Sequence, residues 1–551
     1  MDKLKVRNKF KPKDNYDVNR ERVKREMYKG KRGEREKMIS IAKKNQIEAQ
    51  RKLLQTEVEL PSQITTNFIS MEGLELKKEN DQTSEMVLNT EMNVLDLNKL
   101  INLQLKTENE PQIYQFFIND IQIKGTLKET LQKIKDFSSE TVYQIVYCPE
   151  SLFKVKPLTR GGSVLEGHSD SILTVQFSPD GSVLCSGGGD TIVRFWDMMT
   201  DTPYETEEDI HHAWILCLSF SPCGTFMAAG DVDGYFSVWR TDNHEPIEKR
   251  AVKAHSKWIT SICWQPLHLC KTEGEEMFIT TGKDGYLKMW KARTMKCAIN
   301  IQAHEMAVTK AIWGGENLIY TASQDQTVKV WDVQFNLIKT LTGHAHWINT
   351  MAINTEHLLR TGCYDYDQCK SGQYYEYSEK MQGLSYEEKV KLSKKRYDKF
   401  KEKINSTEKI LTGSDDFTLI LWDQKKSNKP LVRMTGHQGI VNDVKFSPNA
   451  FYLASASFDK CVKVWNANNG NFLFNLRGHV GPVYQLSWSP NSKMLLSCSK
   501  DSTLQCWNVE TKKMMHNLPG HADEIYTVDW SPNGEKAASG SKDRRIRIWV
   551  N

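Results

Sequence analysis

The stretch GHQGIVNDVKFSPNAFYLASASFDKCVKVW, residues 436–465, contains the pattern that decides the fold, because the chain repeats it. A glycine and His437 open the stretch, and Asp459 follows the histidine after 22 residues. Trp465 lies six residues beyond this aspartate, and Ser455 lies four residues before it. The order of histidine, aspartate and tryptophan, with the tryptophan six residues after the aspartate, occurs eight times beyond residue 160, which excludes a chance origin.

In six of the eight repeats the aspartate follows the histidine after 21 or 22 residues, and in all eight the tryptophan follows the aspartate after six. The histidines are His168, His211, His255, His304, His344, His437, His479 and His521. The aspartates are Asp190, Asp233, Asp284, Asp325, Asp416, Asp459, Asp501 and Asp543. The tryptophans are Trp196, Trp239, Trp290, Trp331, Trp422, Trp465, Trp507 and Trp549. Seven repeats add a hydroxyl four residues before the aspartate: Ser186, Thr280, Thr321, Thr412, Ser455, Ser497 and Ser539.

Short β-rich runs such as ILTVQFS and RIRIW separate these markers, and turn sequences such as SPDG and SPNG interrupt them. A repeat of about 40 residues with glycine–histidine and tryptophan markers is the WD-repeat pattern, in which each unit forms one four-stranded blade of a β-propeller. The sequence therefore predicts a mainly all-β chain built around an eight-bladed WD40 β-propeller.

The constant spacing has a physical reason inside a blade. An imidazole can bridge a carboxylate and a hydroxyl, and the hydroxyl can accept a hydrogen bond from the indole N–H. Such a buried network is worth more than its separate bonds, so we interpret each set of four residues as a structural staple and not as a catalytic triad. The second repeat has Ala229 instead of the hydroxyl and Ile210 instead of the glycine, so we expect its blade to be the least well tied.

The ends of the repeat region predict how the ring closes. The chain stops at Asn551, just after the strand of Trp549, so the last blade lacks its outermost strand. Residues 153–159, FKVKPLT, precede the first repeat and are predicted to supply that strand. Pairing of the two ends would remove exposed sheet edges.

One repeat is interrupted, because His344 and Asp416 lie 72 residues apart. The strand-like LLRTG is followed by an insertion at about residues 362–408, in which residues 384–403 have helix-forming composition. Because the insertion interrupts a loop, we expect it to be dispensable for folding. Its Cys363 and Cys369 have no second cysteine pair nearby and do not predict a metal site.

The N-terminal part differs in charge from the rest. Residues 1–52 contain 19 Lys and Arg against 8 Asp and Glu, whereas the whole chain has a net charge of only +5. Such a basic arm suits a polyanion, although a solvated tail or a nuclear-import signal explains it equally well. The arm begins with charged residues where a signal peptide needs an apolar stretch, and no run of about 18 apolar residues follows. We therefore expect neither secretion nor a membrane partner.

Motifs of catalysis are missing from the sequence. It contains no GxSxG, no Walker A and no GxGxxG motif, and HEMAV at His304 is half of a zincin motif without its second histidine. We therefore expect no enzymatic activity, no intrinsic cofactor or metal, and no small-molecule substrate.

Several phrases in the repeats are far more specific than the WD markers. They are GGENLIYTASQDQTVKVW, GHAHWINTMAI, LTGSDDFTLILW, MTGHQGIVNDVKFSP, LASASFDKCVKVW and LPGHADEIYTVDWSPNG. With these phrases the chain resembles the Notchless family of WD-repeat proteins over roughly residues 64–551. The resemblance implies a small α+β ubiquitin-like domain at residues 61–152 and the propeller at residues 153–551. The basic N-terminal extension at residues 1–60 is longer and more basic than is typical of the family, so the resemblance assigns it no role.

The resemblance also implies a function. Notchless proteins act in assembly of the large (60S) ribosomal subunit, and their propeller binds the pre-60S particle, where it touches ribosomal RNA, ribosomal proteins and other assembly factors. Their ubiquitin-like domain docks the metal-ion-dependent adhesion site of midasin, an AAA-type ATPase that remodels the particle and releases the factor. By this resemblance Glu140, just before the strand-like TVYQIVY, completes the Mg²⁺ sphere of midasin, and the protein acts in the nucleolus and nucleoplasm.

Two other functions stay open from the residues alone. WD propellers also serve as substrate adaptors of ubiquitin ligases, and the basic arm would suit a generic RNA-binding scaffold. A solvated glutamate at a strand end is also the common case for an acid such as Glu140.

Overall fold

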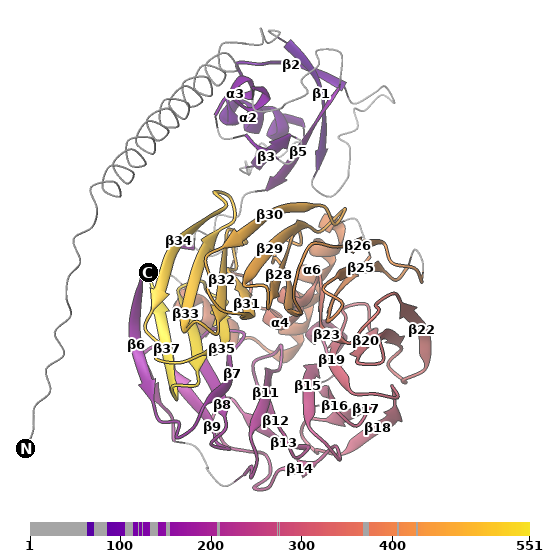
Figure 1. Cartoon of the computed structure of the whole chain (residues 1–551), viewed down its shortest axis with the longest axis vertical. Coiled ribbons are helices and arrows are strands. Elements are labelled where there is room, and N and C mark those ends of the chain that lie inside the picture. The colour runs from indigo at the N-terminus through magenta and orange to yellow at the C-terminus, as the bar shows by residue number, and fades with distance from the viewer. Residues whose placement is uncertain are drawn as a thin grey trace, which may run out of the picture. The chain divides into compact units, whose positions relative to one another are not determined.

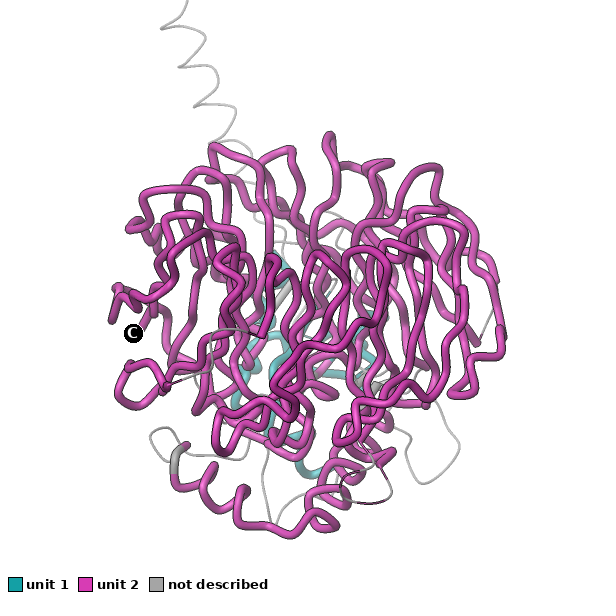
Figure 2. Tube along the Cα trace, turned by 90° about the horizontal axis from the view of Figure 1, so that it is seen from below, with its two compact units in different colours: residues 1–68, 76–111, 115–146 teal, residues 69–75, 112–114, 147–551 magenta. Residues whose placement is uncertain are grey.

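The structure is a computed structural model that describes residues 63–70, 85–104, 114–118, 121–123, 125–132, 142–149 and 155–551, without 206–209, 271, 273, 275, 367–373, 405–406 and 426–427. The predicted basic arm and Glu140 therefore lie outside the described residues. Two compact units are present, one N-terminal and a larger one that extends from Tyr147 to Asn551 (Figure 2). None of the described helices combines the length and the apolar character that a membrane crossing requires.

The N-terminal unit contains one five-stranded sheet and two helices. In chain order they are β1 (Gln63–Ser70), β2 (Glu85–Asn89), α2 (Val94–Gln104), β3 (Tyr114–Ile118), β4 (Ile121–Gln122), α3 (Leu127–Leu131) and β5 (Tyr143–Pro149). The strand order is β2-β1-β5-β3-β4, so the first and last strands lie side by side at the centre. This arrangement fits the ubiquitin-like topology, in which β1 pairs with β2 antiparallel, from Gln63 opposite Asn89.

The hydrophobic periodicity of the sequence explains this small core. In α2, Leu97 and Ile101 are buried one turn apart, whereas Leu95 and Leu103 face solvent. In β5 the side chains of Tyr143, Ile145 and Tyr147 are buried, and those between them are not. One face of this central strand therefore lies on the core. The N-cap of α3 is Thr126, whose hydroxyl accepts a hydrogen bond from the backbone N–H of Glu129.

The larger unit is a ring of eight four-stranded antiparallel sheets, which agrees with the predicted propeller (Figure 1). Blades 1 to 4 comprise β7 (Ile172–Phe177), β8 (Val183–Gly188), β9 (Val193–Asp197) and β10 (Thr202–Pro203); β11 (Ile215–Phe220), β12 (Phe226–Asp231), β13 (Tyr235–Arg240) and β14 (Val252–Lys253); β15 (Ile259–Trp264), β16 (Met277–Gly282), β17 (Tyr286–Lys291) and β18 (Cys297–Gln302); β19 (Val308–Trp313), β20 (Ile319–Ser323), β21 (Thr327–Trp331) and β22 (Leu337–Thr342).

Blades 5 to 8 complete the ring. They comprise β23 (Ile348–Ile353), β24 (Lys409–Ser414), β25 (Leu419–Asp423) and β26 (Val432–Met434); β27 (Val441–Phe446), β28 (Tyr452–Ser457), β29 (Cys461–Asn466) and β30 (Phe472–Arg477); β31 (Val483–Trp488), β32 (Met494–Ser499), β33 (Thr503–Asn508) and β34 (Lys513–Pro519); β35 (Ile525–Trp530), β36 (Lys536–Ser541), β37 (Arg545–Val550) and β6 (Arg160–Glu166).

Burial falls from the middle of each blade to its rim. Every residue of β8 and of β32 is buried, so these second strands read as continuous runs of apolar and small residues. Most residues of the outer strand β34 are exposed. The core is therefore a set of apolar layers between neighbouring blades.

The two ends of the unit pair and close the ring, but the closing strand begins at Arg160, seven residues later than predicted. The closing strand is β6, which pairs with β37 from Glu166 opposite Arg545 to Arg160 opposite Val550. The assignment of residues 153–159 to this strand is therefore wrong. Leu158 is instead buried in the apolar cluster that includes Trp549 of the closing strand pair.

The insertion is longer than expected and begins with a helix. It occupies the connection between β23 and β24, residues 354–408, and contains α4 (Glu356–Thr361), α5 (Tyr374–Gln382) and α6 (Tyr386–Ile404). The LLRTG stretch is helical and not a strand, and α4 ends at Gly362 with φ 56°. A side chain there would lie 2.2 Å from the carbonyl oxygen of Pro222, so this close approach requires glycine.

The insertion packs into the propeller. Figure 2 shows the larger unit edge-on, with helical turns beneath one face of the ring. Tyr397 of α6 is buried in the same cluster as Tyr320 and Trp422, and Phe400 packs against it. A second cluster joins Cys363 and three tyrosines of the insertion to Leu267 of the short helix η1 (Leu267–Leu269). The expectation that the insertion is dispensable for folding does not fit this packing.

Replacing Tyr397 with alanine should therefore reduce the free energy of unfolding by about 3–5 kcal/mol, because it removes a buried aromatic ring from a filled core. Lys399→Ala, on the exposed side of the same helix, is the matched control and should change stability by no more than about 0.5 kcal/mol. Urea unfolding followed by tryptophan fluorescence measures both. Equal stability of the two variants would show that α6 is not part of the core.

Candidate functional site

Each blade contains a hydrogen-bonded set of histidine, aspartate, hydroxyl and tryptophan. The histidine Nδ1 lies 2.6–3.0 Å from the carboxylate, and Nε2 lies 2.7–2.9 Å from the hydroxyl oxygen. The tryptophan Nε1 donates to the same hydroxyl over 2.8–3.0 Å. In seven blades the four residues are those that the spacing predicts.

The direction of these bonds follows from their donors. The indole N–H can only donate, so the hydroxyl accepts from it, and the carboxylate can only accept, so Nδ1 must carry a proton; in the neutral imidazole Nε2 then accepts from the hydroxyl. The histidine then carries its proton on Nδ1 and donates it to the aspartate. One chain of bonds thus joins the turn before the first strand, which we call the histidine turn, to the turn between the second and third strands, the aspartate turn.

In the seven blades that follow the predicted pattern, the environment lowers the pKa of the staple aspartate and favours its charged form. Burial alone would raise the pKa of Asp284, but hydrogen bonds from His255 and from the backbone N–H groups of Ser256 and Tyr286 outweigh burial and lower the pKa to about 2. A carboxylate whose pKa is lower in the folded state stabilises the fold at neutral pH and loses this contribution as the pH falls from about 4 to 2.

The second blade satisfies the same network with two different residues. His211 Nδ1 lies 2.8 Å from a carboxylate oxygen of Asp231 and not of Asp233, and its Nε2 lies 2.7 Å from the hydroxyl of Ser237. The indole of Trp239 donates to this same hydroxyl. Asp233 as the staple residue is therefore wrong, and the blade is fully bonded rather than poorly tied.

The geometry of the sheet explains this exchange. Ser237 lies directly opposite Ala229 across the β12–β13 pair, so the hydroxyl has moved to the neighbouring strand at the same height. Other blades have Arg, Lys, Ile or Gln at the position of Ser237, which lies two residues before the tryptophan. A serine there, together with a missing hydroxyl at Ala229, is the signal that sequence reasoning overlooked.

Charged residues of the insertion hold the inner ends of several blades. The guanidinium of Arg360 in α4 donates to both carboxylate oxygens of Asp529 in β35 and to the carbonyl oxygen of Phe177 in β7. Glu356 in the same helix pairs with Lys445 of β27 at 2.9 Å. Burial would raise the pKa of Glu356, but Lys445 and Lys310 lower it to about 2. The helix α4 therefore links blade 5 to blades 1, 4, 6 and 8.

A buried glutamate fixes the end of the insertion. Glu408 is 3% exposed and accepts hydrogen bonds from the N–H of Gly315 and from the hydroxyls of Tyr320, Thr355 and Tyr397. Burial nevertheless raises its pKa. Neither this glutamate nor Arg360 was identified from the sequence, because no local pattern shows that a charged residue will find partners in another blade.

The exposed side of the histidine turns carries aromatic residues. Tryptophans three residues after the histidine are 56% exposed at Trp214, 45% at Trp258 and 40% at Trp347. In each case the tryptophan carbonyl oxygen accepts a hydrogen bond from the aspartate turn of the same blade, from the N–H of Val232, Lys283 or Asp415. The backbone of each tryptophan is therefore fixed while much of its ring faces solvent.

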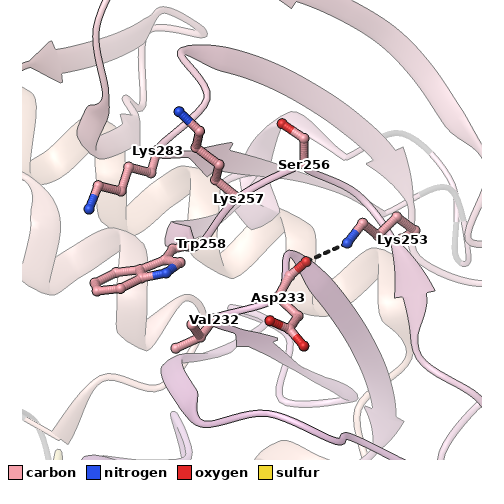
Figure 3. A pocket seen from close by; sticks show the side chains of 7 residues that line it. All are labelled: Val232, Asp233, Lys253, Ser256, Lys257, Trp258 and Lys283. Atoms are coloured by element: carbon pink, nitrogen blue, oxygen red, sulfur yellow. Dashed lines mark hydrogen bonds between the residues drawn. The ribbon is translucent and has the colours of Figure 1, made fainter.

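A pocket of about 420 Å³ lies between the turns of blades 2 and 3. Figure 3 shows Trp258 with Lys257 and Lys283 of blade 3 on one side of the pocket, and Lys253 from the outer strand of blade 2 on the other side, beside Asp233. The ammonium of Lys283 lies 4.3 Å from the centroid of the Trp258 ring. The ammonium of Lys253 donates to the backbone carbonyl of Asp233, whose carboxylate also lines the pocket. The lining has a net charge of +2.

Comparison with known proteins agrees with the fold. The family model described as WD domain, G-beta repeat matches residues 161–197, 206–240, 247–291, 295–332, 428–466, 470–508 and 512–550. Between the first and last matched repeats, the longest stretch that it leaves unmatched, residues 333–427, contains the insertion. The crystal structure of a computationally designed protein, Ika8, is 21% identical and covers 72% of this chain and 100% of its own, with a TM-score of 0.53, a likeness of fold alone.

Three curated relatives are much more similar. Protein Notchless of Drosophila melanogaster is 39% identical over 64% of this chain and 69% of its own length, and the Notchless protein homolog of Arabidopsis thaliana is 43% identical over 71% and 78%. Ribosome assembly protein 4 of Saccharomyces cerevisiae is 36% identical over 68% and 73%. The chain belongs to the Notchless family. This Notchless-family chain keeps all eight staples, although blade 2 builds its staple from shifted positions.

The exchanged staple of this family member is directly testable. Asp231→Ala should reduce the free energy of unfolding by about 1–3 kcal/mol, because it leaves buried His211 without its acceptor. Asp233→Ala should leave stability unchanged, and Asp501→Ala in an ordinary blade gives the reference loss. Urea unfolding measures all three, and a larger loss for Asp233→Ala than for Asp231→Ala would restore the original assignment.

Proposed function

We propose that this chain is a non-enzymatic assembly factor of the large (60S) ribosomal subunit that acts in the nucleolus and nucleoplasm. The observation that carries the proposal is its 36% identity to Ribosome assembly protein 4 over 68% of the chain. The structure supports a binding role, since the turns of a rigid ring display fixed aromatic and basic residues. Among the described residues, no group of three or more His, Cys, Asp or Glu side chains is arranged to hold a metal.

The N-terminal unit is proposed to dock the adhesion site of midasin, which holds a Mg²⁺ ion. Mg²⁺ requires near-octahedral oxygen coordination and usually keeps several waters, so an incoming carboxylate can replace one of them. Glu140 is the proposed ligand, and it precedes the start of β5 at Tyr143 by three residues. Force that pulls on this site would then act on the central strand of the sheet, flanked by β1 and β3.

This position suits the transfer of force from an ATPase to the propeller. Tyr143, Ile145 and Tyr147 anchor β5 by burying their side chains. The chain continues from β5 toward β6, the strand that closes the ring. A pull on Glu140 would therefore reach the propeller along a covalent path, and the energy for release would come from the partner because this chain has no motif for nucleotide hydrolysis.

Sucrose-gradient sedimentation of the tagged full chain tests the assembly role. Comigration with 60S precursors, detected by their precursor RNA, is the expected result. Copurification with a ubiquitin ligase in the absence of precursors would favour a substrate adaptor and contradict the proposal.

Binding of the full chain to the midasin adhesion domain in Mg²⁺ tests the docking step. Glu140→Ala should weaken binding at least about tenfold, as expected when a metal site loses a ligand interaction. Glu140→Asp should also weaken it, because the shorter side chain cannot reach the octahedral position. Asp136→Ala is the matched control, and EDTA should abolish binding by the unchanged chain. Wild-type affinity for Glu140→Ala, or indifference to EDTA, would refute the docking step.

A further inference from the structure

The pocket between blades 2 and 3 combines features that point to a ligand. The exchange of staple residues in blade 2 leaves Asp233 without a role inside the blade, because Asp231 takes the bond to His211. Aspartates at this position in other blades are held by their histidines, as Asp284 is by His255. Asp233 is instead exposed at the pocket, where it places a carboxylate among lysines.

The tryptophan of the pocket is a fixed, flat surface. Its carbonyl oxygen accepts from the N–H of Lys283, which holds the turn, while 45% of the residue is exposed. A planar aromatic ring at this degree of exposure can stack on a nucleobase, an interaction that tolerates any base. Trp214 occupies the equivalent position in blade 2, so two such rings lie on neighbouring blades of the same face.

The lysines suit a polyanion. Lys253, Lys257 and Lys283 are exposed and line the pocket from an outer strand, a histidine turn and an aspartate turn (Figure 3). Ammonium groups neutralise phosphates as point charges. The carboxylate of Asp233 can accept a hydrogen bond from a base amino group or from a ribose 2′-hydroxyl, which donates and distinguishes RNA from DNA.

We infer that this pocket binds a short unpaired segment of RNA. A base stacks on Trp258, the flanking phosphates contact Lys253, Lys257 and Lys283, and Asp233 accepts a hydrogen bond from the base or the ribose. An acidic peptide fits less well, because its carboxylates could pair with the lysines but would not stack on Trp258 and would offer no hydrogen-bond donor to Asp233. The inference rests on the proposed function, since a ribosomal precursor offers such RNA segments.

Fluorescence anisotropy with a labelled 12-nucleotide oligouridine and the full chain tests the inference at physiological salt. Trp258→Ala should weaken binding by about 5- to 100-fold, the usual effect of removing one stacked base platform. Trp258→Phe should retain most of the affinity. Trp347→Ala removes an equally placed tryptophan from blade 5 and is the matched control, with an expected change of less than about twofold.

Charge is tested by replacing the three pocket lysines with glutamine in one variant. The slope of log K against log salt concentration should become less steep by about 2, because each of the three lost phosphate contacts on a single strand contributes about 0.7 to the slope. Lys249→Gln, Lys296→Gln and Lys513→Gln together remove the same charge from other exposed positions and should leave the affinity nearly unchanged. The N-terminal arm is present in every variant and contributes equally.

Ultraviolet cross-linking of the oligouridine followed by peptide mapping locates the contact. Cross-links in the peptide that contains Trp258 are expected, and cross-links confined to residues 1–52 would overturn the inference. It would also be overturned if Trp258→Ala bound like Trp347→Ala, or if oligoglutamate bound the pocket as tightly as RNA and lost affinity with Trp258→Ala. A chain that comigrates with 60S precursors but fails these tests would lose only this inference, whereas failure to comigrate refutes the proposed function independently.

Discussion

The hydrogen-bond chain from tryptophan through hydroxyl and histidine to aspartate is the interaction on which the propeller depends. It is buried, and each of its polar groups has a partner in the same blade, so its members reinforce one another in a low-dielectric interior. The chain ties the histidine turn to the aspartate turn eight times around the ring. One face of the molecule is thereby rigid, and side chains on these turns are displayed without much loss of entropy on binding.

The insertion in blade 5 interrupts the repeat pattern, and its contacts with other blades stabilise the ring. A propeller of similar blades holds each sheet mainly by its two neighbours, but Arg360 joins blade 5 to Asp529 in blade 8 and to blade 1. The acid Glu408 accepts hydrogen bonds from Thr355 just before α4, from α6 and from blade 4, so that the insertion is anchored at both ends. Because of these contacts, the insertion is part of the propeller core although the sequence suggests a surface loop.

Much of this architecture could be predicted from the sequence, because markers at fixed spacing report local geometry. Blade number, seven staples and the helix α6 follow from such local signals. The errors occurred where a contact between distant residues decides the outcome. FKVKPLT and RGGSVLE both precede the first repeat, and only the register with β37 selects the second. LLRTG has an apolar start that suits either a strand or a helix, and the partners of Arg360 and Glu356 in other blades favour the helix.

Blade 2 shows why a sequence pattern and the chemistry beneath it can separate. Asp233 still lies six residues before Trp239, so the spacing survives although the bond to His211 has moved to Asp231. Since Ser237 and Ala229 face each other across the sheet, the exchange costs no buried hydrogen bond. What changes is the surface: a carboxylate that other blades use internally becomes available beside Lys253 and the Trp258 ring. A blade that keeps its stability while releasing one polar group gains a surface group for binding, and this links the staple to the face that we assign to RNA.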